Sequence, residues 1–96
     1  MVRKDEFRKN KRGHGHPSWV FEKQGRNLKS FDITHTAEYQ GVKNIPLSKN
    51  PNPRKQDEKA YFIKDQITQH ESHYGRKYKD YSLPRKDKRN MERYKK

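Results

Sequence analysis

The chain has 96 residues, and its 25 Lys and Arg against 12 Asp and Glu give a formal net charge of +13. Only 26% of the residues are hydrophobic, against roughly 45–50% apolar residues (counting Gly) in an average globular chain. This length and composition exclude a second domain, a large buried core and a substrate-enclosing enzyme of barrel size. One tryptophan, six tyrosines and four phenylalanines argue against a wholly disordered chain, so we expect one small domain with a polar surface.

Cysteine is absent, which excludes disulfides and thiolate metal ligands. The chain contains no apolar run of about 18 residues, and its first residues are charged. These features predict a cytoplasmic protein without a membrane partner. The net charge makes a polyanion the expected partner, because basic side chains release the counterions condensed on phosphates.

The positive charge is concentrated at the two ends of the chain. Residues 1–12 carry six basic and two acidic residues, and residues 68–96 carry ten and four. Blocks of like charge are typical of arms that bind nucleic acid. We therefore expect a basic flexible arm over 1–12, a small β-barrel domain over 13–81 and a basic helical segment over 82–96.

The first strand signals form a hairpin. Residues 18–21 are rich in β-forming side chains, and residues 24–27 have the composition of a turn. Beyond the turn, Phe31 and Ile33 alternate with polar residues, although Leu28 falls out of that register. These two segments predict an antiparallel hairpin.

Further short strands follow. Residues 42–47 predict a strand that Pro46 confines to an edge or a strand end, and the Asn-Pro-Asn-Pro run at 50–53 predicts a loop. Residues 60–63 together with Ile67 form the strongest strand signal in the chain. Four or five short strands joined by Gly, Pro and Asn turns predict a small mainly β barrel or sandwich.

The C-terminal segment has the signals of a short helix. Ser82 is the expected cap, with Asp87 in the early turns. Met91 and Tyr94 are the main apolar residues that follow, and their spacing allows one turn to pack against the barrel while the remainder is solvated.

Histidines at metal-ligand spacings occur as His14-x-His16 and His70-x-x-His73. Glu71 is the sole carboxylate beside either pair, and the cationic surroundings repel a dication. We therefore expect no metal and no cofactor. Exposed histidines in a basic protein are instead expected to contact phosphates.

The loop at residues 13–17 and the segment at 31–36 are candidate site regions. Two glycines and a proline allow the loop backbone to approach a ligand closely, and a histidine there can donate or accept a proton. The second segment ends in hydroxyls and an imidazole. The alternatives are an entry loop into the first strand and, for the threonine, a β-branched filler.

Aromatic and basic residues alternate over 74–81. Tyrosines among cations can stack on unpaired bases while the cations hold phosphates. The alternative is that one or two of these tyrosines cover the edge of the barrel.

The order of motifs resembles the MazF/PemK-like toxins of bacterial toxin–antitoxin modules. The motifs that carry the resemblance are Gly15-His16-Pro17 before an apolar strand, Ile33-Thr34 at a hairpin end, the strand from Ala60 to Ile67 and the helix start from Ser82 to Asp87. This resemblance spans about residues 13–92. It implies an SH3-like barrel, commonly dimeric, that cleaves single-stranded RNA without a metal and is paired with an antitoxin protein.

The resemblance also implies site residues. The family's basic residue before proline falls on His16, where the family usually has Arg, and its strand-end threonine falls on Thr34. Arg12 and His14 lie close enough in sequence to substitute for that Arg. We thus expect His16, Thr34 and Arg12 to be catalytic, and nucleic acid to be bound by His14, Arg26, His35, Arg76, Lys77, Tyr78, Lys79, Arg85 and Lys86.

Three non-catalytic functions compete with this prediction. The first is a nucleic-acid-binding protein in which both basic ends clamp the ligand. The second is a phage or mobile-element protein that inhibits a nuclease complex, and the third is a ribosome-associated protein. An enzyme degrades RNA at catalytic ratios, whereas a binding protein shifts RNA mobility without cutting it and does so with salt-sensitive affinity.

Overall fold

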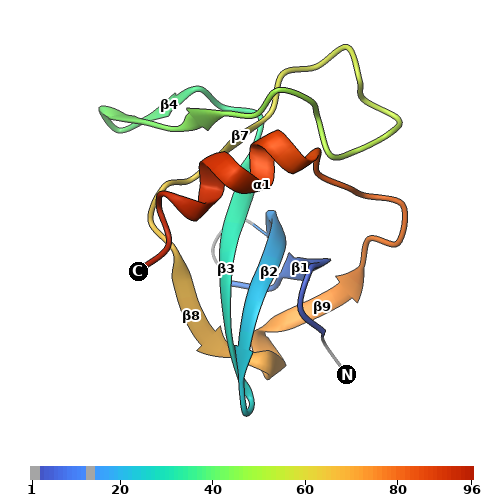
Figure 1. Cartoon of the computed structure of the whole chain (residues 1–96), viewed down its shortest axis with the longest axis vertical. Coiled ribbons are helices and arrows are strands. Elements are labelled where there is room, and N and C mark those ends of the chain that lie inside the picture. The colour runs from blue at the N-terminus through green and yellow to red at the C-terminus, as the bar shows by residue number, and fades with distance from the viewer. Residues whose placement is uncertain (1–2, 13–14) are drawn as a thin grey trace.

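A computed structural model describes residues 3–12 and 15–96 of the chain. These residues form a compact antiparallel sheet and one short C-terminal helix (Figure 1). The predicted fold class, mainly β with a short C-terminal helix, is confirmed, and the sheet is consistent with a small barrel. The elements in chain order are β1 (Glu6–Asn10), β2 (Pro17–Gln24), β3 (Asn27–Thr34), β4 (Glu38–Tyr39), β5 (Val42–Lys43), β6 (Ile45–Pro46), β7 (Tyr61–Phe62), β8 (Ile67–His70), the 3-10 turn η1 (Glu71–His73), β9 (Tyr74–Lys77) and α1 (Arg85–Glu92).

The hairpin of β2 and β3 is the centre of the sheet. A two-residue turn joins the strands, and Gly25 in it adopts a φ of +62°, which glycine tolerates better than other residues. The predicted hairpin is confirmed. The register shifts between Val20 and Glu22, so two residues of β2 oppose one of β3 at a bulge.

The two sides of this hairpin bury different side chains. On the aromatic side, residues of β1, β2 and β3 pack in one cluster with α1 and the segment before it. Figure 1 shows α1 crossing in front of β3. The buried residues there are Phe7, Trp19, Phe21, Phe31, Ile33, Ala60, Phe62, Leu83 and Met91. On the other side, called the polar side here, Val20, Leu28 and Tyr74 form a small second cluster. Leu28 left the expected alternation because it belongs to this second cluster.

The N-terminal segment is part of the sheet. The expected flexible arm over 1–12 is wrong for residues 6–10, because β1 pairs with both β2 and β9. Phe7 is 4% exposed and Asn10 is 2% exposed. Burial of one aromatic ring and two ladders of backbone hydrogen bonds outweigh the charge of the neighbouring Arg and Lys residues.

The strand signal at residues 60–67 resolves into two elements. β7 is two residues long and pairs with β3 and β6, whereas Ile67 begins β8, which pairs with a different part of β3. A strand within 60–63 is confirmed by β7, whereas the inclusion of Ile67 in the same strand is wrong. Pro46 lies in β6, the terminal strand on that side of the sheet, as its missing N–H requires.

The helix is anchored differently from the prediction. Pro84, not Ser82, occupies the N-cap position, and no side chain caps the helix there. Asp87 in the first turn is buried and accepts hydrogen bonds from the backbone N and the Oγ of Ser48, both at 2.9 Å. Met91 is fully buried and Tyr94 packs against the same cluster, as their spacing predicted.

Candidate functional site

His16 and Thr34 meet at the open end of the β2–β3 hairpin. His16 directly precedes β2 and Thr34 ends β3, and the pairing of Ser18 with Asp32 sets the two strand ends side by side. The His16 carbonyl accepts the Asn10 N–H at 2.9 Å, which fixes the entry into β2 against β1. Both residues line two adjacent pockets.

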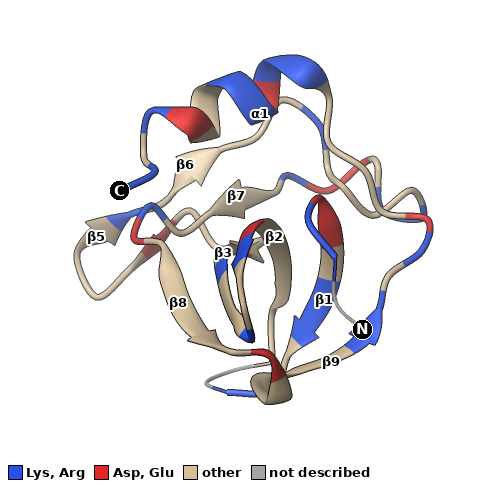
Figure 2. Cartoon of the chain, turned by 60° about the horizontal axis from the view of Figure 1, so that its bottom comes forward, with Lys and Arg blue, Asp and Glu red and all other residues tan. Residues whose placement is uncertain are grey.

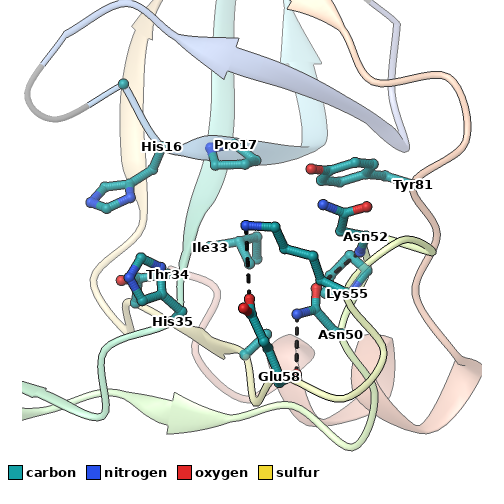
Figure 3. A pocket seen from close by; sticks show the side chains of 13 residues that line it. His16, Pro17, Ile33, Thr34, His35, Asn50, Asn52, Lys55, Glu58 and Tyr81 are labelled. Carbon is teal, nitrogen blue, oxygen red and sulfur yellow. Dashed lines mark hydrogen bonds and ion pairs between the residues drawn. The ribbon is translucent and has the colours of Figure 1, made fainter.

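The first of these, the loop pocket, has a volume of about 240 Å³ and is drawn in Figure 3. His16, Thr34 and His35 lie on one side, and Lys55 extends toward them from the loop that crosses the pocket (Figure 3). The remaining lining comes from Gly15, Pro17, Ile33, Asn50, Pro51, Asn52, Glu58, Ala60 and Tyr81.

Hydrogen bonds within the 50–58 loop hold its shape. The Asn50 Nδ2 donates to the Glu58 carbonyl at 3.1 Å, and the Gln56 Nε2 donates to the carbonyls of Asn50 at 2.8 Å and Asn52 at 2.7 Å. The Lys55 ammonium lies 3.8 Å from a Glu58 carboxylate oxygen, and both side chains are more than half exposed. Such an exposed pair is weak, so Lys55 remains available to an anion in the pocket.

The tyrosines of the 74–81 segment have three different environments. Tyr74 is 5% exposed and its hydroxyl lies 2.6 Å from the Ser30 Oγ, so its ring is closed to a base. Tyr78 and Tyr81 stack with ring centroids 4.6 Å apart and pack on the aromatic cluster. Tyr81 also lines the loop pocket, where burial raises the pKa of its hydroxyl, with Tyr78 adding to the rise. The alternative that tyrosines cover the barrel is correct for Tyr74, and Tyr81 keeps access to the pocket.

Strands β4 and β5 pair with each other in a separate two-stranded sheet, called the β4–β5 arm here. The second pocket, the hairpin pocket, lies between the open end of the hairpin and this arm and has a volume of about 520 Å³. It is lined by His16, Asp32, Thr34, Thr36, Tyr39, Gln40, Val42, Asn44, Ile63 and Asp65. Tyr39 and Val42 are the large hydrophobic residues most exposed among those described.

A buried polar network supports the wall shared by the two pockets. The Asp32 Oδ1 accepts hydrogen bonds from the Ser18 Oγ and, at 3.2 Å, from the Asn10 Nδ2. The Asn10 Oδ1 in turn accepts from the Gln69 Nε2 at 3.0 Å. All of these residues are less than a tenth exposed, so strands β1, β2, β3 and β8 are tied together by neutral donors around one carboxylate.

No acceptor among the described residues takes the hydroxyl hydrogen of Thr34. Its Oγ1 accepts the Thr36 N–H at 3.2 Å, and an oxygen that accepts this bond still has its hydroxyl hydrogen to donate. Thr34 is buried, whereas the neighbouring His35 is exposed at the rim. The pair therefore offers a fixed hydroxyl beside an accessible imidazole.

The predicted site residues separate into groups. His16, Thr34 and His35 come together in the loop pocket, whereas Arg12 and Arg26 line neither pocket, and Arg26 lies in the turn at the opposite end of the hairpin. His14 lies outside the described residues.

None of the other predicted cations lines either pocket. Arg76 lies over the Tyr78 ring at 5.1 Å, and Lys77 pairs with Glu6 at 3.3 Å. Lys79 precedes Asp80, which pairs with Arg54 of the 50–58 loop and has its pKa lowered by that guanidinium. Arg85 and Lys86 are exposed in the first turn of α1, and much of the ribbon of α1 is blue in Figure 2.

Sequence reasoning missed Lys55, Glu58 and Asn50 on one side of the site and Asn44 and Asp65 on the other. All five come from loops or short arms that reach the hairpin end through long-range contacts. The Asn-Pro-Asn-Pro run was a local signal for a rigid loop, but nothing in it indicated which strand end the loop would approach.

Among the described residues there is no group of three or more His, Asp and Glu side chains arranged to hold a metal ion. The described part of the chain likewise contains no helix of the length and apolar character needed to cross a membrane. The chain matches no protein-family model, no curated protein and no solved structure.

Proposed function

We propose that the protein binds single-stranded RNA and cleaves it without a metal at the loop pocket. The observation that carries this proposal is the gathering of two imidazoles, one hydroxyl and one ammonium around a single pocket: His16, His35, Thr34 and Lys55. These are the groups that RNA cleavage needs when the 2′-hydroxyl attacks its own phosphate.

Every covalent bond that forms or breaks between heavy atoms in this reaction belongs to the RNA. The 2′-oxygen forms a bond to phosphorus, the bond from phosphorus to the 5′-oxygen breaks, and the products are a 2′,3′-cyclic phosphate and a 5′-hydroxyl. One imidazole takes the proton from the 2′-hydroxyl and the other gives a proton to the 5′-oxygen. Imidazole performs both transfers near neutral pH, which is the reason that two histidines facing one pocket support this chemistry.

The remaining groups stabilise charge on the phosphorus. The Thr34 hydroxyl hydrogen can donate to a non-bridging oxygen, because its own oxygen already accepts the Thr36 N–H and is held in place by it. Lys55 supplies positive charge from the opposite side of the pocket. Preorganised donors and cations of this kind act where negative charge develops in the transition state.

The surrounding charge supports RNA as the substrate. The chain carries a formal net charge of +13, and Arg85, Lys86 and Lys79 lie exposed beyond the loop pocket, on segments that contact the 50–58 loop. A single strand lying across this rim releases condensed counterions, so its affinity is expected to fall steeply with salt.

The test is incubation of the purified protein with a long single-stranded RNA in EDTA, read on a denaturing gel. We expect discrete fragments, and a rate lower by about 100-fold or more in His16→Ala and in His35→Ala, since a positioned acid or base contributes on that order. His73→Ala, a histidine of η1 outside both pockets, is the matched control and should cut normally.

Thr34→Val keeps the shape of the buried side chain and removes its hydroxyl, so it should slow cleavage while the thermal unfolding profile stays cooperative. Intact RNA together with a salt-sensitive shift on a native gel would overturn the enzyme proposal and leave a binding protein. Fragments that persist in both His16→Ala and His35→Ala would place the activity elsewhere.

A further inference from the structure

We propose that the hairpin pocket holds a guanine base of the RNA strand, beside the phosphate that is cleaved. This inference rests on the function proposed above and names the base that the site prefers. The hairpin pocket and the loop pocket share His16 and Thr34, so a nucleotide in either one is adjacent to the same reacting groups.

The first argument is an acceptor left open in the wall of the pocket. Asp32 lines the hairpin pocket and is 8% exposed. Its Oδ1 accepts the two hydrogen bonds from Ser18 and Asn10, whereas no described residue donates to Oδ2 and no described cation pairs with the carboxylate. No fully buried side-chain oxygen or nitrogen of the described residues lacks a partner, so Oδ2 is accessible from the pocket and can accept an N–H from a ligand.

Asn44 adds a second open acceptor with a fixed orientation. Its Nδ2 donates to the Thr36 carbonyl at 2.8 Å, and only the amide nitrogen can satisfy a carbonyl, so Oδ1 must be the atom left over. Asn44 is also 8% exposed and lines the same pocket. The exposed Asp65 carboxylate at the rim forms no ion pair with any described residue.

Asp32, Asn44 and Asp65 thus present acceptors to the pocket, and its other walls include the apolar side chains of Val42 and Ile63. A flat ring with adjacent N–H donors fits this pattern. The Watson–Crick edge of guanine presents N1–H and N2–H₂ side by side and binds a carboxylate with two hydrogen bonds. Adenine and cytosine have an acceptor nitrogen beside their single amino group, and uracil has a carbonyl oxygen on each side of its one N–H. Each of these bases therefore places at least one acceptor against an acceptor of the pocket.

The test is an NMR titration of the isotopically labelled protein with GMP, IMP, AMP, CMP and UMP. All five carry the same phosphate, so differences between them report the base. We expect GMP to bind about tenfold or more tightly than AMP, CMP or UMP, with IMP weaker than GMP because it lacks the 2-amino group. The shifted resonances should include those of Asn44 and Asp65.

Asp65→Asn should weaken GMP about tenfold, and Asp57→Asn, an exposed carboxylate that lines neither pocket, is the matched control. Asp32→Asn keeps one oxygen for Ser18 and Asn10 but turns Oδ2 into a donor, so it should abolish the preference for GMP. If Asp32→Asn does not fold, the exposed Asp65 position still decides the question.

Binding and cleavage give separable outcomes. A preference for GMP that Asp65→Asn removes supports the base pocket, whether or not RNA is cut. Equal binding of the nucleotides, or no binding of any of them at millimolar concentration, overturns the base pocket. Cleavage that persists in that case leaves the nuclease proposal standing with a different rule for choosing its site.

Discussion

The two sides of the β2–β3 hairpin are held together by different interactions. The aromatic side packs Phe21 on Phe31 at 5.0 Å and Phe31 against the edge of Phe62 at 5.5 Å, under the cover of α1. On the polar side, the buried residues Asp32 and Ser30 form hydrogen bonds instead, with Ser18 and Tyr74 respectively. Apolar contacts can be exchanged at small cost, whereas a hydrogen-bond network fixes the positions of its members. The side that fixes positions is the one that reaches both pockets.

The largest effect is expected from breaking the aromatic side. Phe31 is fully buried at the centre of the aromatic cluster, so Phe31→Ala should lower the free energy of unfolding by about 3–5 kcal/mol. Urea denaturation followed by circular dichroism measures the change. Tyr39→Ala is the control, since Tyr39 is 56% exposed and its loss should change the unfolding free energy by about 0.5 kcal/mol or less. Equal losses in the two variants would show that the aromatic cluster does not dominate stability.

A smaller effect is expected from the polar side. Ser30→Ala and Tyr74→Phe each remove one partner of a buried hydrogen bond, and each should cost about 1–3 kcal/mol. The double variant should cost less than the sum of the two, because the second change removes a group that the first had left unpaired. Additive losses would mean that the two hydroxyls do not interact in solution.

The smallest effect is expected in alkaline solution, where each side carries one tyrosine with a raised pKa. Burial raises the pKa of Tyr74 on the polar side and of Tyr81 on the aromatic side above the ordinary value of 10.0. Ionisation is therefore easier in the unfolded chain, so this contribution to stability is full below pH 10.0 and is lost progressively as the pH rises through the folded-state values.

The measurement is the free energy of unfolding between pH 9 and pH 12 for the parent chain and for Tyr74→Phe and Tyr81→Phe. Each substitution should flatten the fall of stability with pH, because phenylalanine has no proton to lose. Tyr74 is the more deeply buried residue, so Tyr74→Phe should have the larger effect. Parallel pH profiles for all three chains would contradict the shifts at both positions.

Local patterns predicted the parts of the fold that depend on neighbouring residues. The turn at Gly25 sets the register of the β2–β3 hairpin, and that register alone brings His16 beside Thr34. Pro46 marked the end of a sheet, and Met91 with Tyr94 marked the buried turn of α1.

The missed features depend on contacts between distant residues. β1 carries a single aromatic residue among charged ones, so local sequence gives a weak strand signal. Its place in the sheet depends on pairing with β2 and with β9, which lies almost seventy residues later in the chain. Asp87 had the signature of a helix start, but its buried contacts to Ser48 span 39 residues. Lys55, Asn44 and Asp65 reach the site in the same way, so composition and spacing could indicate a basic site without indicating the acceptors beside it.

Trp19, the single tryptophan of the chain, contacts residues near both the N-terminus and the C-terminus. Its Nε1 donates to the Asp5 carboxylate at 2.8 Å, and the Lys95 ammonium lies over its ring at 5.6 Å. Indole emission responds to the polarity and the charges around the ring. Release of either the N-terminal residues or the last residues of the chain should therefore change the emission spectrum. Tryptophan fluorescence of the intact protein can thus detect fraying of either terminus without an added label.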